Sequence, residues 1–269
     1  MSIIDVLENG KMGKTLGRGE FGCVKLIKSG RKEYALKCQT TKDFGQFYAS
    51  VREEFCTFIK HPNIIFCFDS LWDDFNWYGL YEVGVPLCPH DQHHKVLWDI
   101  AKGLACLHAH GVVHRDIKPN NIVRVGERYK IIDFGLARPL TKTSDTQSEG
   151  MVSLFWRPIE ILEGGNTDAR CDVWSLGVVC LSLLRGYHLF DGTCDNIISQ
   201  FKALKFSFEE GVYSKMVCGL DKRWNSFQLC DDLCLEYSTE TSVPLVSAVH
   251  RDALLGRDVD IDMYNKNGF

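Results

Sequence analysis

The sequence predicts an α+β protein in which a small β-rich lobe precedes a larger helical lobe. Two observations carry this prediction. Apolar and polar residues alternate through the first eighty-odd residues, as in strands, whereas residues beyond 93 show helical periodicity. The joint is expected near Glu82–Leu87, which gives lobes of residues 1–83 and 84–269. A chain of 269 residues is long enough to bury a sizeable core.

The expected elements follow the chain in order. In the first lobe the patterns predict strands at Val24–Ile27 and Tyr34–Cys38, a helix over about 46–60, and strands at Ile64–Phe68 and Trp77–Val83. The helix is expected to end at His61-Pro62, because proline restricts the residue before it. In the second lobe helices are expected at Lys95–His110 and Asp172–Leu184, with weaker patterns near 196–206 and 228–236.

Charge and hydropathy exclude several classes of protein. The chain has 31 Lys and Arg against 35 Asp and Glu, a net charge of −4, so charge indicates neither a nucleic-acid nor a membrane surface. The longest strongly apolar stretch, Val173–Leu184, is shorter than the roughly twenty residues that span a bilayer. The first residues contain no apolar signal-peptide core, so we expect an intracellular protein of the cytoplasm or nucleus. The twelve cysteines form no Cys-x-x-Cys pair and are expected to be free thiols.

Four short motifs point to chemistry. They are Gly17-Arg18-Gly19-Glu20-Phe21-Gly22-Cys23-Val24, Ala35-Leu36-Lys37, His114-Arg115-Asp116-Ile117-Lys118-Pro119-Asn120-Asn121, and Asp133-Phe134-Gly135. Glycines let a backbone approach a phosphate closely and donate N–H groups to it. Taken singly, the glycine motif is as well explained by an ordinary turn, and a lone strand lysine by a surface charge.

Together, and in this order, the motifs resemble those of the eukaryotic protein kinase family, over a region from about Lys11 to about Leu255. The resemblance implies a bilobal kinase fold, β-rich in its first lobe and helical in its second, with an ATP cleft between the lobes. It also implies that Lys37 holds the α- and β-phosphates of ATP, that Asn121 and Asp133 hold Mg²⁺, that Asp116 accepts the proton of the substrate hydroxyl, and that Lys118 steadies the transferring phosphate. The ATP-binding set that it implies is Leu16, Gly17, Gly19, Gly22, Val24, Ala35, Lys37, Glu53, Tyr81, Glu82, Gly84, Asn121 and Asp133.

The family pairs the strand lysine with a glutamate on the following helix. Glu53 and Glu54 both qualify, and spacing alone does not decide between them. The string Val51-Arg52-Glu53 resembles the Ile-Arg-Glu of cyclin-dependent kinases, which favours Glu53.

The segment Ser153-Leu154-Phe155-Trp156-Arg157-Pro158-Ile159-Glu160 resembles that of cyclin-dependent and mitogen-activated kinases, the CMGC branch. The resemblance implies a Ser/Thr kinase that acts on protein substrates, with Arg157 ordering a segment that accepts proline after the phosphoacceptor and Ser153 bonding near Asp116 and Lys118. It places Ser148 at the activating phosphorylation position, with the arginines Arg52, Arg115 and Arg138 converging on it. Whether a cyclin-like or other activating protein is needed stays open.

Two departures from the family pattern are visible. The usual Ala-Pro-Glu is replaced by Pro158-Ile159-Glu160, and alignment puts Ser242 where the arginine partner of that glutamate belongs. Either Arg223 or Arg251 takes its place, or Glu160 is less buried than in the family. Asp172 is expected to brace the catalytic loop.

An active kinase is not the only hypothesis. The alternative is a pseudokinase, a nucleotide-binding scaffold. Because Lys37, Asp116, Asn121 and Asp133 are all present, the sequence favours the active enzyme.

Overall fold

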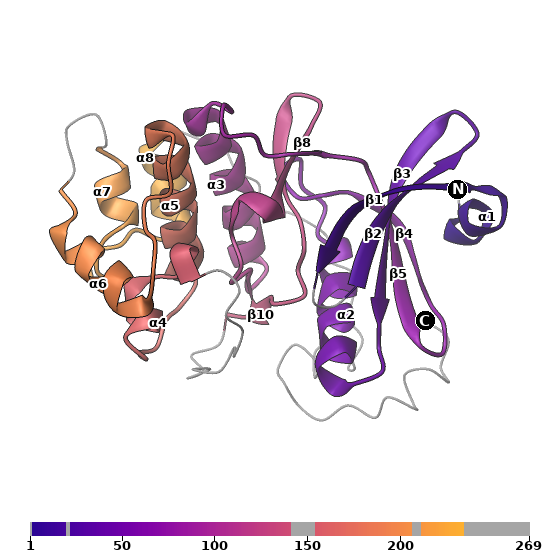
Figure 1. Cartoon of the computed structure of the whole chain (residues 1–269), viewed down its shortest axis with the longest axis horizontal. Helices are drawn as coiled ribbons and strands as arrows, with labels where there is room; N and C mark the ends of the chain where they lie inside the picture. The colour runs from indigo at the N-terminus through magenta and orange to yellow at the C-terminus, as the bar shows by residue number, and fades with distance from the viewer. Residues whose placement is uncertain (1, 20–21, 141–153, 206–210, 234–269) are drawn as a thin grey trace. The chain divides into compact units, whose positions relative to one another are not determined.

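The computed structural model describes residues 2–19, 22–140, 154–205 and 211–233 (Figure 1). They divide into two compact units, which we call the sheet unit and the helical unit. The sheet unit holds the residues up to Val85 together with Ile132–Arg138, and the helical unit holds Pro86–Ile131 and the described residues from Pro139 onward. The sequence placed a single break after Val83. Ile132–Arg138 instead belongs with the earlier residues, because its side chains and backbone bond to Lys37 and Glu53.

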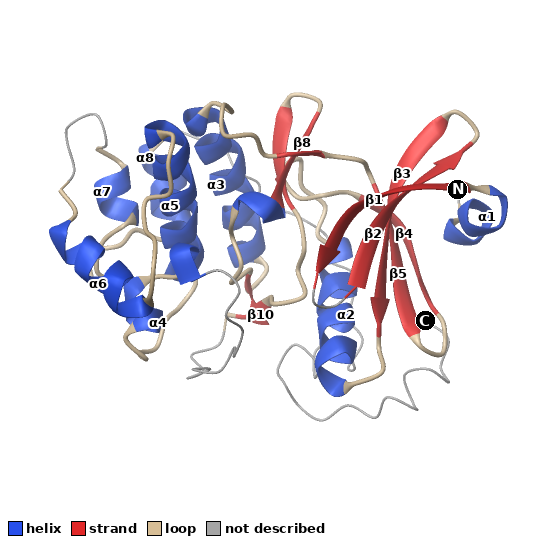
Figure 2. Cartoon of the chain, viewed as in Figure 1, coloured by secondary structure: helices blue, strands red, loops and turns tan. Residues whose placement is uncertain are grey.

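The sheet unit is built on a five-stranded antiparallel sheet (Figure 2). The strand order is β1-β2-β3-β5-β4. The strands are β1 (Lys11–Gly19), β2 (Gly22–Ser29), β3 (Lys32–Thr40), β4 (Cys67–Trp72) and β5 (Asn76–Tyr81). Successive side chains of a strand point to opposite faces, so this sheet presents two different surfaces for packing.

One expected strand lies in a different place. The apolar run Ile64–Phe68 predicts a strand, but β4 begins only at Cys67. Ile64 instead closes a turn after Pro62, with its N–H donating to the carbonyl of His61, and both Ile64 and Ile65 are buried. The run is apolar because it fills the core beneath the turn, which periodicity cannot distinguish from a strand.

Helix α2 (Phe44–Thr57) confirms the helix predicted over about 46–60. It begins after Asp43, whose carboxylate accepts a hydrogen bond from the N–H of Gln46 at 2.8 Å, as a typical N-cap does. Lys37 points toward this helix, whereas its neighbour Leu36 points to the other face of the sheet.

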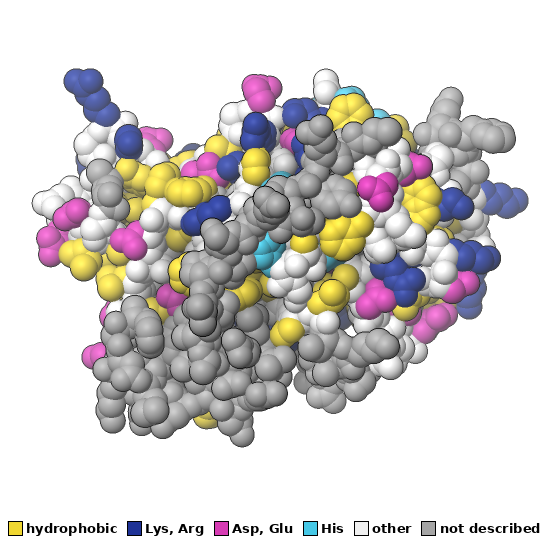
Figure 3. All heavy atoms as spheres, turned by 180° about the vertical axis from the view of Figure 1, so that it is seen from behind, with side chains coloured by type: hydrophobic (Ala, Val, Ile, Leu, Met, Phe, Trp, Pro, Cys, Tyr) yellow, Lys and Arg dark blue, Asp and Glu magenta, His cyan; other side chains and the backbone are white. Residues whose placement is uncertain are grey.

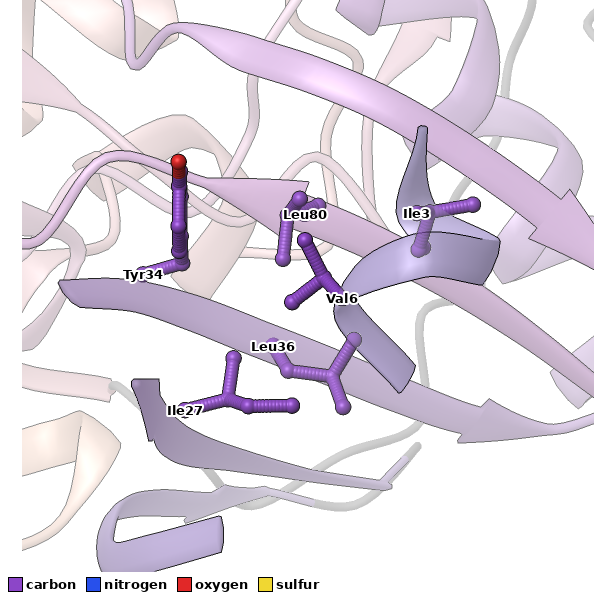
Figure 4. Close-up of a cluster of buried hydrophobic side chains, with 6 residues drawn as sticks. All are labelled: Ile3, Val6, Ile27, Tyr34, Leu36 and Leu80. Carbon is purple, nitrogen blue, oxygen red and sulfur yellow. The ribbon is translucent and has the colours of Figure 1, made fainter. Parts of the chain in front are cut away.

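A short helix, α1 (Ile3–Asn9), covers the face to which Leu36 points. Ile3 and Val6 from α1 pack with the side chains of strands β2, β3 and β5, as Figure 4 shows. The sheet side chains of this buried cluster are Ile27, Tyr34, Leu36 and Leu80. Seven residues are too few to show periodicity, so the sequence did not predict α1; the signal available was the capping box formed by Ser2 and Asp5.

The helical unit is organised around α3 (His93–Ala109) and α5 (Arg170–Arg185), which pack against each other. Both confirm helices expected from periodicity. Helix α5 ends at Gly186, whose φ of +74° suits the left-handed cap that glycine adopts without strain. The remaining helices are α4 (Ile159–Leu162), α6 (Cys194–Ala203), α7 (Tyr213–Met216) and α8 (Ser226–Asp232), with short 3₁₀ turns at Pro119–Asn121 and Leu154–Trp156.

Five short strands complete the described part of the chain. Strands β8 (Ile122–Val125) and β9 (Arg128–Ile131) form an antiparallel hairpin that follows the Pro119–Asn121 turn. The others are two residues long each: β6 (Val85–Pro86), β7 (Val112–Val113) and β10 (Arg138–Pro139).

The surface agrees with the mixed composition. On the face drawn in Figure 3, Lys and Arg side chains are interspersed with Asp and Glu rather than gathered into one broad basic patch of the described residues. Within the described part of the chain, no helix combines the length and apolar character needed to cross a bilayer. The eleven cysteines that the structure describes are all free thiols, as expected.

Candidate active site

The described glycines of the motif lie on the paired ends of β1 and β2. Gly17 lies opposite Val24 and Gly19 opposite Gly22. A Cβ atom at Gly22 would meet the carbonyl oxygen of Cys38, so packing against β3 requires glycine there. A Cβ at Gly17 or Gly19 would meet no atom within 4 Å. Packing within the described chain therefore does not explain these two glycines, whereas close approach of a ligand would. Leu16, exposed beside them on β1, is on the same hairpin.

Lys37 on β3 lies between two carboxylates. Its Nζ is 2.9 Å from Glu53 Oε2 and 2.8 Å from Asp133 Oδ1. The side chain of Glu53 is 1% exposed, whereas that of Asp133 is 42% exposed. The Glu53 carboxylate is therefore buried, and the Asp133 carboxylate is accessible. Burial by itself would lower the pKa of Lys37, but Asp133 and Glu53 outweigh burial and hold that pKa well above its ordinary value. Lys37 is therefore a fixed cation at neutral pH.

The choice between the two glutamates is now decided. Glu53, which the sequence favoured, is the partner of Lys37. Glu54 turns instead toward β4, where its Oε1 accepts hydrogen bonds from Trp72 Nε1 at 2.9 Å and from Ser70 Oγ at 3.4 Å. Adjacent positions on a helix are about 100° apart, so the two side chains reach different strands.

The Asp-Phe-Gly segment is held by α2 as well as by Lys37. The N–H of Phe134 donates to Glu53 Oε2 at 2.6 Å, and Arg52 Nη1 donates to the carbonyl of Gly135 at 2.6 Å. Asp133 has a φ of +66°, an uncommon conformation for a residue with a side chain. Strain of this kind persists where surrounding contacts over-determine the backbone, and here those contacts turn the Asp133 carboxylate toward Lys37.

Three of the predicted ATP-binding residues, Tyr81, Glu82 and Gly84, lie at the end of β5 and just after it. The sheet register places Ala35 opposite Tyr81 and Val24 opposite Lys37, which gathers these predicted ATP-binding residues on neighbouring strands. The N–H of Glu82 donates to the carbonyl of Phe66 at 3.1 Å, and its carboxylate accepts from the N–H of Phe66 at 2.8 Å. A contact between Glu82 and an adenine would therefore use the Glu82 carbonyl.

In the helical unit, the predicted catalytic residues meet around Asp116. Lys118 Nζ lies 2.7 Å from Asp116 Oδ2. Asn121 Nδ2 donates to both the carbonyl and the Oδ2 of Asp116, at 2.8 Å each. Because the amide nitrogen of Asn121 is used in this way, its Oδ1 is the atom that it would offer to a cation.

Asp172, the first acidic residue of α5, braces this loop as the sequence predicted. It is fully buried and accepts hydrogen bonds from the N–H groups of His114 and Arg115 at 2.8 Å each. Arg115 has a φ of +68°, so these bonds hold the loop in an uncommon backbone conformation. Burial would raise the pKa of Asp172, but His108 and the backbone donors outweigh burial and lower it.

His108 also supports this loop, through its contact with Asp172, and it was not predicted from the sequence. Its Nε2 lies 3.0 Å from Asp172 Oδ2, and its Nδ1 lies 2.7 Å from Ser226 Oγ. The three residues are joined only by tertiary packing, 64 and 118 positions apart, so no local pattern could have grouped them.

Glu160 is paired with Arg223. Arg223 Nη1 and Nη2 donate to Glu160 Oε1 and Oε2 at 2.7 and 2.8 Å, and Thr167 Oγ1 donates to Oε1 at 3.0 Å. Of the two substitutes that the sequence offered, Arg223 is the one that pairs with Glu160, whereas Ser242 and Arg251 lie outside the described residues. Arg223 lies three residues before the first residue of α8, and its Cζ is 4.7 Å from the centroid of the Trp174 ring.

The structure describes the three arginines of the expected cluster but not the serine on which they are expected to converge. Arg52 and Arg138 belong to the sheet unit, where they donate to the carbonyls of Gly135 and Ala137. Arg115 belongs to the helical unit. Ser148, on which the three arginines are expected to converge, and Ser153 lie outside the described residues, so these roles stay predictions. Arg157 is described, and its N–H donates to the carbonyl of Leu154 in a 3₁₀ turn.

Each unit contains an oxygen donor of the kind that Mg²⁺ prefers. Magnesium prefers oxygen ligands and is typically held by one or two carboxylates plus substrate phosphates rather than by an all-protein cage. The accessible carboxylate of Asp133 and the Oδ1 of Asn121 are ligands of this kind. The described residues contain no cluster of three or more His, Cys, Asp or Glu that could hold a metal ion.

Comparison with known sequences agrees with the geometry. The sequence model of the family described as the protein kinase domain matches residues 11–228. The chain belongs to the protein kinase family. This kinase is 30% identical over 198 residues to the probable CTD kinase subunit alpha homolog of Encephalitozoon cuniculi, a match that covers 68% of this chain and 59% of that protein. It is 36% identical over 130 residues to ribosomal protein S6 kinase alpha-3 of human and of mouse, covering 45% of this chain and 18% of those proteins. The chain thus spans less than two thirds of the length of these relatives.

Proposed function

We propose that this kinase transfers the γ-phosphoryl group of Mg-ATP to serine and threonine hydroxyls of proteins. The observation that carries the proposal is the arrangement around Asp116, a carboxylate oriented by Asn121 and paired with Lys118 within 2.8 Å. A carboxylate held in this way serves as an acceptor for a hydroxyl proton. A scaffold that only bound nucleotide would not need it.

The residues of the sheet unit would hold the nucleotide. Lys37, fixed by Glu53, neutralises negative charge on the α- and β-phosphates. The glycine hairpin offers backbone N–H groups at positions where Gly17 and Gly19 leave room for a phosphate. Magnesium, when bound by Asp133 and Asn121, neutralises the charge that develops on the transferring group.

The residues of the helical unit would serve the acceptor. Asp116 orients the substrate hydroxyl and takes its proton as the new O–P bond forms and the bond from the γ-phosphorus to the bridging oxygen of ADP breaks. The Lys118 ammonium balances charge on the phosphoryl oxygens. The backbone of this loop is pre-set by Asp172, so little reorganisation is needed during transfer.

The transfer is tested directly with labelled Mg-ATP and a basic protein substrate. We expect incorporation of phosphate by the wild-type chain and loss of it in Asp116→Asn, which keeps the shape of the side chain but removes the base. Retained ATP binding with no transfer above that of Asp116→Asn would show that the chain is a pseudokinase instead.

We further propose a preference for proline after the phosphoacceptor. This rests on Arg157 and on the resemblance of residues 153–160 to the CMGC branch. A peptide-library screen measures it. Enrichment of basic residues before the acceptor, without proline after it, would place the enzyme in another branch.

Regulation is part of the proposal. Phosphorylation of Ser148 would add an anion for Arg52, Arg115 and Arg138 to bind. Mass spectrometry of active enzyme, with kinetics of Ser148→Ala, tests this, and full activity of an unphosphorylated Ser148→Ala protein would rule it out.

We also propose that an activating protein partner binds this kinase. One relative is named as a subunit, and such a relative suggests assembly with a cyclin-like or other protein. Full activity of the purified chain alone would argue against that partner.

We place the enzyme in the cytoplasm or nucleus, where Mg-ATP is abundant, and imaging of a tagged chain tests this.

A further inference from the structure

Tyr81 contacts the glutamate of the Lys37 pair directly. Tyr81 ends β5, is 6% exposed, and its hydroxyl donates to Glu53 Oε1 at 2.9 Å. The other carboxylate oxygen, Oε2, takes Lys37 Nζ at 2.9 Å and the N–H of Phe134 at 2.6 Å. One oxygen of Glu53 therefore bonds Tyr81, and the other bonds Lys37 and Phe134.

The burial of Glu53 makes the tyrosine contact important. An ionised carboxylate inside a protein is costly unless each oxygen is hydrogen-bonded or paired. Among the described residues, the Tyr81 hydroxyl is the group that donates to Oε1. Burial and the charge of Glu53 raise the pKa of Tyr81 well above its ordinary value, so the hydroxyl keeps its proton and remains a donor.

The ring that carries this hydroxyl is held in place by its own strand. Tyr81 packs against Trp77, four residues earlier on the same strand, with ring centroids 6.4 Å apart and an interplanar angle of 61°. Gly79 lies between them, and a Cβ there would come within 2.6 Å of both rings. The absence of a side chain at Gly79 thus lets the two rings approach, which fixes the direction of the Tyr81 hydroxyl.

We propose that Tyr81 is a positioning residue whose hydroxyl sets the rotation of the Glu53 carboxylate, so that Oε2 is presented to Lys37 and to the N–H of Phe134. This rests on the proposed function, since the Lys37 pair matters for transfer only in a kinase that is active. A residue expected from the sequence to lie beside bound ATP acts here through a polar contact with Glu53 of α2.

The test is Tyr81→Phe, which removes one oxygen atom and keeps the ring. Hydrogen bonds to charged groups contribute about 1.5–3 kcal/mol, so we expect kcat/KM for ATP to fall about tenfold or more. We also expect the amide proton of Phe134 to exchange about tenfold faster by NMR, because its acceptor is less well held. The matched control is Tyr78→Phe on the same strand, whose hydroxyl bonds Asp73 at 2.9 Å and whose ring lies on the other face of the sheet. It should change neither measurement.

A second variant separates positioning from general stability. If Tyr81 acts through Glu53, then Tyr81→Phe should have little further effect on kcat/KM in a Glu53→Gln background, where the charged acceptor is already lost. Fully additive effects, or Phe134 exchange in Tyr81→Phe equal to that in Tyr78→Phe, would overturn the inference. If the wild-type chain transfers no phosphate, the proposed function fails, and the amide exchange still decides the role of Tyr81.

Discussion

At the scale of single residues, Lys37 and Asp133 have the simplest expected phenotype. Each contributes a charge where we propose phosphate and Mg²⁺ to bind, and such charges cannot be replaced by solvent in a closed site. We expect Lys37→Ala and Asp133→Ala each to lower kcat below about a tenth of the wild-type value. Lys25→Ala, which removes the same charge from an exposed position of β2, is the control. Retention of more than that fraction would mean that the residue's role is assigned wrongly.

Arg223 is a second single residue with a sharp prediction. It is 3% exposed, forms two hydrogen bonds with Glu160 and also donates to the carbonyl of Cys218. Truncation leaves Glu160 without its cation, a loss that costs about 3–5 kcal/mol for a buried pair. Urea denaturation of Arg223→Ala should show it, whereas Arg124→Ala in the β8–β9 hairpin should stay within about 0.5 kcal/mol. Equal stability of the two variants would contradict this account.

At the scale of elements, α2 is attached to the sheet by two adjacent glutamates. Glu53 bonds β3 and β5, and Glu54 bonds Trp72 and Ser70 of β4. Because the two glutamates point in different directions around the helix axis, α2 cannot rotate about that axis without breaking the contacts of one of them. The second attachment is tested by a double-mutant cycle of Glu54→Ala and Trp72→Phe. We expect a coupling free energy of about 1.5 kcal/mol or more in unfolding measurements, and a coupling near zero would show that this contact adds nothing.

Helix α1 stabilises the sheet from its other face. Val6 is fully buried in the cluster drawn in Figure 4, while Ile4 on the same helix is about half exposed. Val6→Asp would bury a polar group among apolar side chains, at a cost of about 2–7 kcal/mol. We expect a clearly lower Tm for Val6→Asp and a change within about 0.5 kcal/mol for Ile4→Asp. Similar Tm values for the two variants would mean that α1 is not attached in solution.

At the scale of the whole molecule, Asp172 links folding to pH. Because its pKa is lowered in the folded state, this carboxylate contributes stability that is fully present above the ordinary aspartate value of about 3.9 and is lost as pH falls toward the folded value. We expect Asp172→Asn to be less stable at neutral pH and to show a weaker dependence of unfolding free energy on pH from about 5 to about 3. Asp195→Asn, at an exposed position of α6, serves as the control, and a pH dependence of Asp172→Asn equal to that of wild type would refute the linkage.

The sequence by itself determined the α+β class, the long helices α2, α3 and α5, and the identity of the motif residues. These follow from local pattern, because periodicity over ten or more residues and short contiguous motifs are both written within one stretch of chain. The resemblance they carried agrees with the family match over residues 11–228. Two short features were not predicted: α1 is seven residues long, and an apolar run in a turn was taken for the start of β4.

Only the tertiary structure decided which side chains meet. Glu53 rather than Glu54 faces Lys37, Arg223 pairs with Glu160, and the Tyr81 hydroxyl reaches Glu53 across 28 positions of sequence. Each choice depends on the rotation of a helix or on the place where a loop packs. Those are set by the burial of distant apolar side chains such as Trp77 and Trp174, so the polar contacts follow from the core and cannot be derived from the spacing of the polar residues themselves.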